Sequence, residues 1–273
     1  MRLEDDIRGM RILFFGDIMG GLGRAAVKKI IPQYKKRYKP DLILANGENL
    51  AHLKGMTPKT VKEVLDSGID YLTNGNHFFG RKEIIEVVNK KMPIIRPANY
   101  PEDTPGQGYV IIKKDKQNIL LINLLGRVFL RPVLDCPFRK AEEILKKTKA
   151  NLKKNIIIVD FHAEATSEKA AFGYWLDGKV SAVVGTHTHV PTADNKILSK
   201  GTAYVTDIGM VGASDSIIGA AKEGIIRSYL TQIPEPLISP QEGQATINAV
   251  LIEIDDKSHL SKKIIRCDEE VLI

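Results

Sequence analysis

The chain has 273 residues, a formal net charge of +7 at pH 7 and a hydrophobic fraction of 43%. This hydrophobic content excludes a disordered chain and provides for a sizeable core. The charged start excludes a signal peptide, and no apolar run approaches the roughly 18 residues of a membrane span. We therefore expect a cytoplasmic protein with no membrane association. It would have one α/β domain at residues 10–273 and an extension at residues 1–9.

The positive charge has two interpretations, a nucleic-acid surface or solvated helix faces. The basic clusters are short, scattered and not interleaved with aromatic residues, as a platform for single strands would require. Solvated faces are therefore favoured. The two cysteines, Cys136 and Cys267, are far apart in sequence and do not predict a disulfide framework.

Buried strands alternate with helices in the first third of the chain. Short apolar runs predict strands at residues 11–16, 41–46 and 70–73. Helices are expected after them, at residues 23–38, 58–67 and 81–89. The second helix begins with Thr57 as N-cap and Pro58 at the first helical position. This alternation is typical of an α/β sheet with short loops at one edge.

Further strands and helices follow in the rest of the chain. Neighbouring strands are expected at residues 108–113 and 118–123, and a helix after Pro137 within residues 134–149. The alternation then resumes with strands at residues 155–160, 181–184 and 202–206. Thr166 and Ser167 are expected to cap a helix that runs through Trp175. Strands at 245–254 and 259–266 are expected to form a closing hairpin, and residues 234–240 a loop.

Residues that can bind metal follow the C-terminal ends of these predicted strands. They are Asp17, Glu48, Asn49, Asn76, His77, His162, His187 and His189. In open α/β sheets, sites form beyond the carboxyl ends of the strands. A lone histidine is usually structural, but four of the 6 histidines of this chain lie in these loops. In an extended segment His187 and His189 would point the same way and reach one metal pair.

The mixture of carboxylate, amide and imidazole groups suits iron, manganese or zinc better than calcium or magnesium alone. Two such metals, roughly 3.5–4 Å apart, can clamp a phosphoryl group and supply a hydroxide nucleophile. Other catalytic patterns are missing from the sequence. There is no phosphate-binding loop with lysine, no G-x-G-x-x-G spacing after the first strand, and no G-x-S-x-G elbow.

The segments that carry these residues resemble, in order, the motifs of the calcineurin-like metallophosphoesterases. They are Gly16-Asp17, Asn46-Gly-Glu-Asn49, Asn74-Gly-Asn-His77 and Gly185-Thr-His-Thr-His189. Longer segments, at residues 96–99, 160–169, 184–190, 192–194 and 206–210, resemble the YmdB-type branch of bacterial 2′,3′-cyclic-nucleotide phosphodiesterases. The likeness covers almost the whole chain, from about Met10 to the last strand.

This resemblance implies a four-layer α/β/β/α sandwich and a centre of two divalent metal ions, most often iron in this family. One metal would be held by Asp17, Glu48, Asn49 and His189, and the other by Glu48, Asn76, His162 and His187, so that Glu48 bridges. A hydroxide activated by both metals would attack phosphorus, and His77 would protonate the leaving ribose oxygen. The implied substrates are 2′,3′-cyclic AMP and GMP, opened to the 3′-phosphate. RNA ends and a second copy of the chain remain open as partners.

Some positions depart from the family pattern. Met19 stands where the wider superfamily has a histidine, and Asn49 is expected to fill that vacancy. Phe78-Phe79-Gly80 follows His77 where a tryptophan and an aspartate are expected, and Leu50 and Leu53 replace smaller residues. These positions border the site, so they concern substrate fit more than metal binding.

Two alternative functions remain. The net positive charge and the altered loop after His77 are compatible with a regulatory protein that senses a nucleotide or RNA end with little turnover. The predicted metal centre also does not determine which type of bond is cleaved, so a hydrolase acting on an amide or another ester is a third hypothesis.

Overall fold

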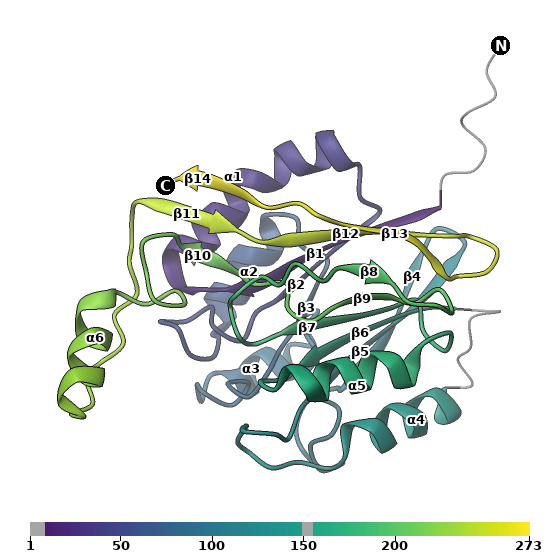
Figure 1. Cartoon of the computed structure of the whole chain (residues 1–273), viewed down its shortest axis with the longest axis horizontal. Coiled ribbons are helices and arrows are strands. Elements are labelled where there is room, and N and C mark those ends of the chain that lie inside the picture. Colours follow the sequence, from purple (N-terminus) through teal and green to yellow (C-terminus); the bar gives the residue numbers. More distant parts are fainter. Residues whose placement is uncertain (1–8, 149–154) are drawn as a thin grey trace.

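The computed structural model describes residues 9–148 and 155–273. Except for Gly9, the extension expected at residues 1–9 lies outside the described residues, as does the last residue of the helix expected within 134–149. The described strands form a sheet of eight strands and a sheet of six, with helices on both outer faces (Figure 1). Among the described helices, none combines the length and the apolar character needed to cross a membrane.

The first sheet is built around β1 (Met10–Ile18). β1 runs parallel to β2 (Leu42–Asn46), which in turn pairs with β3 (Tyr71–Thr73). Residues 10–15 of β1 pair antiparallel with β12 (Ala249–Ile254), whereas residues 17–18 pair in parallel with β10 (Met210–Ala213). The sheet is completed by β11 (Gln244–Ile247), β13 (Ser261–Arg266) and β14 (Glu269–Leu272).

The second sheet has a parallel centre and antiparallel edges. Its parallel strands are β5 (Gln117–Leu125), β6 (Ile156–His162), β7 (Ala182–Thr186) and β9 (Ala203–Val205). Its edge strands are β4 (Tyr109–Lys114) and β8 (Lys196–Ile197). Parallel strands of this kind are buried on both faces, which explains the continuous apolar runs in the sequence.

Helices cover the outer face of each sheet. The first sheet is covered by α1 (Gly20–Tyr38), α2 (Pro58–Asp66) and α3 (Ile84–Asn89), and the second by α4 (Pro137–Lys147) and α5 (Thr166–Leu176). A further helix, α6 (Lys222–Thr231), stands away from both sheets (Figure 1).

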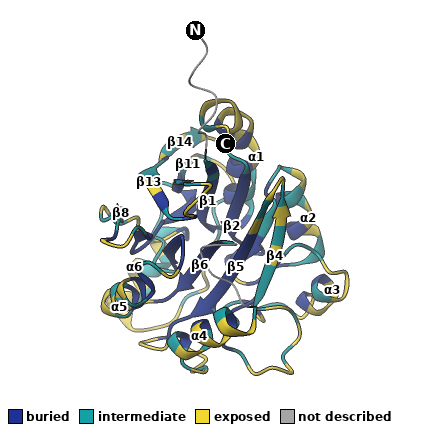
Figure 2. Ribbon diagram, turned by 90° about the vertical axis from the view of Figure 1, so that its right-hand side faces the viewer, coloured by how far each residue is buried: buried dark blue, intermediate teal, exposed yellow. Residues whose placement is uncertain are grey.

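Three hydrophobic clusters join these layers, and the alternation of side chains along the strands explains them. In β1, Leu13 and Phe15 face the helices of the first sheet, whereas Ile12 and Phe14 face the second sheet. In β5, Leu121 faces the first sheet and Leu120 faces α4 and α5. Buried strands therefore lie between outer helices that are only partly buried (Figure 2). This arrangement is the predicted four-layer α/β/β/α sandwich.

Several local predictions are confirmed. Thr57 caps α2 in a capping box with Thr60, and Pro58 is the first helical residue. β4 pairs with β5, and β12 pairs with β13, as antiparallel neighbours.

Two local predictions are wrong. The N-cap of α5 is Ala165, because Thr166 is already helical, and no side chain caps this end. The strand expected at 245–254 is two strands, since Asn248 lies between β11 and β12. Asn248 accepts hydrogen bonds from the amides of Gly16 and Met210. Gly16 is the point along β1 at which pairing with β12 ends and pairing with β10 begins.

Candidate metal centre

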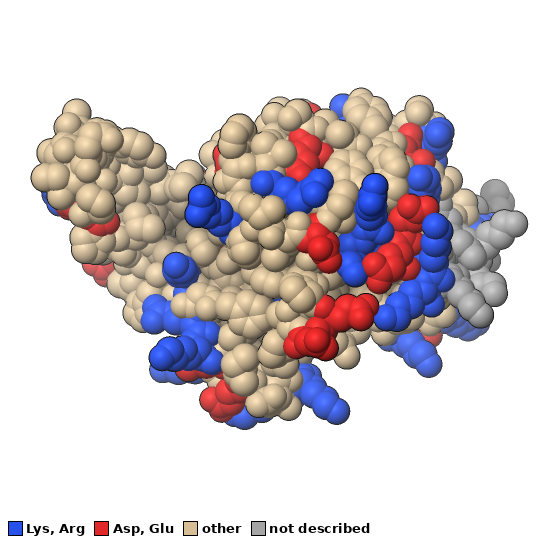
Figure 3. Space-filling model, turned by 90° about the horizontal axis from the view of Figure 1, so that it is seen from below, with Lys and Arg blue, Asp and Glu red and all other residues tan. Residues whose placement is uncertain are grey.

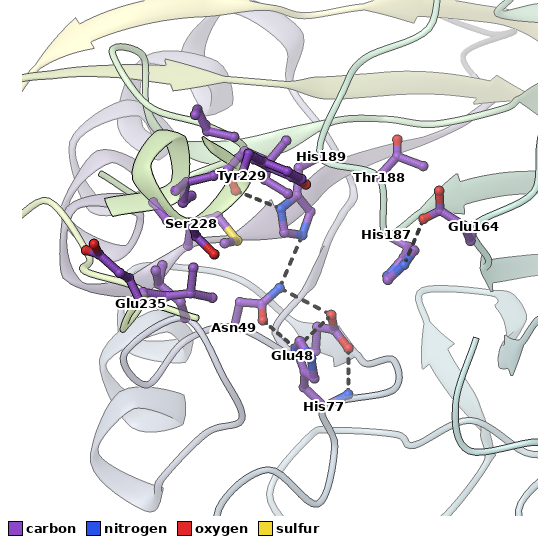
Figure 4. Close-up of a pocket in the computed structure, with 17 residues that line it drawn as sticks. Glu48, Asn49, His77, Glu164, His187, Thr188, His189, Ser228, Tyr229 and Glu235 are labelled. Carbon is purple, nitrogen blue, oxygen red and sulfur yellow. Dashed lines mark hydrogen bonds and ion pairs between the residues drawn. The ribbon is translucent and has the colours of Figure 1, made fainter. Parts of the chain in front are cut away.

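The predicted metal-binding residues converge at the carboxyl ends of strands from both sheets. Asp17 lies in β1 and His162 ends β6, while the others lie in the loops after β2, β3 and β7. Contacts link all of them into one cluster, and Figure 4 shows five of these side chains around one pocket. The cluster divides into two groups that share Glu48.

The first group contains Asp17, Glu48 and His189, with one ligand atom of each within 4.8 Å of the others. Asp17 Oδ1 lies 3.8 Å from His189 Nε2. Asn49 lies between Glu48 and His189, because its Nδ2 is 3.2 Å from Glu48 Oε1 and 3.3 Å from His189 Nε2. Together with Asn49, these are the residues that the resemblance implies for the first metal.

The second group contains Glu48, His162 and His187. His162 Nε2 is its centre, since it lies 3.3 Å from Glu48 Oε1 and 3.1 Å from His187 Nδ1. Asn76 Oδ1 is also 3.1 Å from His162 Nε2. Together with Asn76, these are the residues that the resemblance implies for the second metal, and Glu48 belongs to both groups.

Features of this structure test whether the cluster fits metal ions. Asp17 Oδ1 is fully buried and has no hydrogen-bond partner within the described residues. A buried carboxylate oxygen without a partner is costly unless a cation is near. Gly75 keeps the space open, because a Cβ there would collide with His162 Nε2 and Glu48 Oε2. The donor set of carboxylates and imidazoles therefore fits divalent cations.

Neighbouring side chains orient the histidines. Thr186 Oγ1 donates to Asp160 at 2.7 Å, so it accepts from His162 Nδ1 at 2.9 Å. His162 Nε2 therefore faces the cluster. Such partners commonly fix the tautomer of a ligand histidine. Asp160 was missed as a supporting residue, although its position two residues before His162 in a strand places both side chains on one face.

The other two histidines are oriented in the same way. His189 Nδ1 donates to the carbonyl oxygen of Ile218 at 2.9 Å, which leaves Nε2 for the cluster. His187 Nε2 lies 3.1 Å from Glu164 Oε2, which leaves Nδ1 facing His162. Neither Glu164 nor Ile218 was predicted from the sequence to have a role.

The expectation of an extended His187–His189 segment is wrong. Both residues have positive φ angles, 106° and 62°, so the segment is not extended; His187 belongs to one of the two groups that share Glu48 and His189 to the other. Non-glycine residues in such conformations are strained and must be held by their surroundings. Here the amide of His187 donates to Asp17 Oδ2, and that of Thr188 donates to Asp207 Oδ2, both at 3.1 Å.

Burial and charge shift the pKa values of this cluster. Burial raises the pKa of Asp17 well above its usual range, and the charge of Glu48 adds to the shift. Burial alone would lower the pKa of His162, but the carboxylates of Glu48 and Asp17 raise it to about 9. Burial and the charge of His162 lower the pKa of His187 to about 3. The two carboxylates therefore favour positive charge at the centre of the cluster, and a bound cation would supply it.

His77 lies beside the first group at the edge of the pocket. Its backbone amide donates to Glu48 Oε2 at 2.9 Å, and its Nδ1 is 3.0 Å from Asn49 Oδ1. Its side chain keeps 32% of its surface exposed, whereas Glu48 keeps 1%. His77 can therefore reach a ligand in the pocket.

Most positions that depart from the family pattern pack into the fold. Phe78 and Leu50 are fully buried in the core beneath α1–α3. Phe79 lies edge-on to Tyr100, with ring centroids 5.5 Å apart, and does not line the pocket. Met19 and Leu53 do line it, so these two affect the space offered to a ligand.

The cluster lies at one end of a cavity of about 490 Å³. Pockets that bind small molecules typically measure roughly 300–1,000 Å³. Residues 217–237, which include α6, form the opposite wall.

The four-layer fold and this cluster define the chain as a metallophosphoesterase. The model of the family described as YmdB-like protein matches residues 13–267, and the chain belongs to this family. It is 48% identical to the 2′,3′-cyclic-nucleotide 2′-phosphodiesterase of Bacillus subtilis over 257 residues, which are 94% of this chain and 96% of that protein.

Solved structures agree with this assignment. A novel phosphatase from Mycoplasma pneumoniae is 36% identical, with a TM-score of 0.90 over 97% of this chain and 94% of that chain. A hypothetical protein from Thermus thermophilus is 39% identical, with a TM-score of 0.88 over 96% of this chain and 99% of that chain.

Proposed function

We propose that this protein hydrolyses 2′,3′-cyclic nucleotides, such as 2′,3′-cyclic AMP and GMP, to 3′-nucleotides with two divalent cations. The observation that carries the proposal is the pair of ligand groups that share Glu48 and open onto one cavity. The name of the B. subtilis relative supports the choice of substrate. The donor set suits iron, manganese or zinc, and the family resemblance favours iron among them.

The residues of the chain have distinct roles in this proposal. One cation is held by Asp17, Glu48, Asn49 and His189, and the other by Glu48, Asn76, His162 and His187. Two cations there would supply a hydroxide nucleophile at neutral pH and withdraw charge from the phosphoryl oxygens. The water oxygen adds to phosphorus, the P–O2′ bond breaks, and the 2′-oxygen takes a proton.

His77 is the proposed donor of that proton. Burial lowers the pKa of His77, which makes its protonated form a stronger acid. Its contact with Asn49 supports this role, because Asn49 Oδ1 lies 3.0 Å from His77 Nδ1 and accepts the Nδ1–H of a protonated imidazole, which leaves Nε2–H for the substrate.

The test combines metal content with product analysis. We expect two metals per chain in the natively purified protein or after loading with Mn²⁺, and release of adenosine 3′-phosphate from 2′,3′-cyclic AMP. Two metals without hydrolysis of either cyclic nucleotide would contradict the substrate and favour a sensor or another phosphoester. No metal uptake, even from Mn²⁺ or Fe²⁺, would contradict the centre itself.

A further inference from the structure

We propose that α6 and its flanking segments hold the nucleobase of the substrate, with Tyr229 as the ring on which the base stacks. This inference rests on the proposed function and names the part of the site that recognises the nucleoside. It assigns a role to residues that lie outside the metal cluster, on and beside a helix that the sequence pattern did not predict.

The position of α6 is unusual for a helix in a sandwich. None of its residues is buried, and Figure 1 shows it projecting from the end of the molecule. A helix with no buried face contributes little to the core. It is fixed at its base, where Ile225 packs against a small buried cluster that includes Met19 and Leu53. The amide of Ala221 also donates to the carbonyl oxygen of Ile238 at 2.9 Å.

One side of α6 faces the metal cluster across the cavity. Ile225, Ser228 and Tyr229 line the cavity from the helix, and Ile218 and Leu237 line it from the flanking segments. Figure 4 shows Ser228 and Tyr229 on the side of the pocket opposite Glu48 and His77. A nucleotide whose phosphate lies at the metals would therefore direct its base toward α6.

The chemistry of this wall suits an uncharged flat group. None of the described residues that line the cavity is a lysine or an arginine. The α6 end of the molecule also presents few charged side chains in the space-filling view (Figure 3). A chain of further phosphates would need cations there, whereas a nucleobase needs apolar and aromatic contacts. Tyr229 is 76% exposed, so its ring is accessible to a base.

The polar groups of the wall predict weak discrimination between bases. Glu235 is the carboxylate of this wall, and Arg227 binds both of its oxygens, at 2.8 Å and 2.6 Å. Ser228 offers a single hydroxyl. An apolar pocket rejects a related ligand poorly when few buried polar groups would be left unpaired. Adenine and guanine should therefore be accepted with similar KM values.

The wall is also connected to the metal cluster. The carbonyl oxygen of Ile218, four residues before α6 begins, accepts the hydrogen bond from His189 Nδ1. Base recognition and metal binding thus meet at one backbone segment, which keeps the distance between the two subsites fixed.

The experiment compares Tyr229→Ala with wild type in the metal-loaded full chain. We expect KM for 2′,3′-cyclic AMP to rise about 5- to 150-fold, the usual loss for one base–aromatic stack, with kcat nearly unchanged. A base-free substrate, methyl riboside 2′,3′-cyclic phosphate, should be hydrolysed equally by both proteins. Tyr229→Phe should restore KM. Leu230→Ala is the matched control, because Leu230 is 79% exposed on the same helix but does not line the cavity.

A binding measurement keeps the inference independent of turnover. Calorimetric titration with adenosine 3′-phosphate should show the same loss of affinity in Tyr229→Ala and none in Leu230→Ala. Equal affinity of Tyr229→Ala and wild type would overturn the base site, even if cyclic nucleotides are hydrolysed. Weaker binding by Tyr229→Ala without hydrolysis by wild type would retain the base site and reject the proposed reaction.

Discussion

The ammonium group of Lys169 lies 2.6 Å from the carboxylate of Asp207, and both side chains are buried. This ion pair lies behind the strained segment that carries His187 and His189, because Asp207 Oδ2 also accepts the amide of Thr188. The ion pair thereby joins α5, the helix that carries Lys169, to the segment before β10, beneath the metal cluster.

Lys169→Met should destabilise the protein. The change leaves the carboxylate of Asp207 buried without its counter-charge, and breaking a buried pair in this way costs about 3–5 kcal/mol. The free energy of unfolding can be measured by urea denaturation of the metal-free protein. The double variant Lys169→Met/Asp207→Asn should recover part of the loss, since no unpaired charge remains. Equal stability of the single variant and wild type would show that the pair is not desolvated.

Glu48→Gln should abolish turnover and leave the fold intact. Glu48 is the residue shared by both ligand groups, and an amide cannot bridge two cations as a carboxylate does. Removing only a hydrogen-bond partner of a metal ligand costs about 10- to 100-fold in metal affinity or activity. Removing the shared ligand itself should therefore lower activity by more than ~100-fold. Metal content and hydrolysis of 2′,3′-cyclic AMP are the measurements. Glu142→Gln, on the surface of α4, serves as the control, and full activity of Glu48→Gln with metal present would exclude the bridging role.

The position of the site could be predicted from the sequence because the alternation of strands and helices brings carboxyl ends to a common edge. Asp17, Glu48 and His162 follow or end apolar strands, and this local pattern is visible in one dimension. The pairing of β1 with both β10 and β12 could not be predicted, since it depends on contacts between distant segments.

The base-facing helix was missed for a different physical reason. α6 buries no residue, so its pattern is not that of a core-facing helix. The spacing of Ile225, Ile226, Tyr229 and Leu230 is nevertheless helical, with pairs at i and i+4. The roles of Asp160 and Glu164 were missed because a supporting hydrogen bond is visible only in three dimensions.

His77→Gln should lower kcat strongly for a substrate whose leaving group needs a proton and only weakly for one whose leaving group does not. A general acid contributes about 10²- to 10⁴-fold when the leaving oxygen needs a proton, as the ribose 2′-oxygen does. A 4-nitrophenyl phosphodiester has a leaving group that is stable without protonation, so its hydrolysis should fall far less. Parallel steady-state kinetics on both substrates separate these cases. Equal losses on both would assign His77 to metal or phosphate positioning instead.

Glu164→Gln should weaken metal binding at the second group. Its carboxylate lies 3.1 Å from His187 Nε2 and favours the tautomer that directs Nδ1 into the cluster. Loss of such a partner typically costs about 10- to 100-fold in metal affinity. Competition with a fluorescent chelator measures the affinity of both sites. Only one of the two dissociation constants for Mn²⁺ should change, because Glu164 does not contact the other group. If neither constant changes, Glu164 does not have this role.

Metal binding at neutral pH should release about one proton per chain from His162. The neighbouring carboxylates raise the pKa of His162 to about 9, so the metal-free protein carries this proton at pH 7, whereas a ligand imidazole must be neutral. The raised pKa also stabilises the metal-free fold fully below about pH 6.5, and this contribution is lost as the pH rises through 9. Calorimetry of Mn²⁺ binding in buffers of different ionisation enthalpy counts the protons. The release should vanish above the raised pKa, and a count near zero at pH 7 would mean that His162 is already neutral before the metal binds.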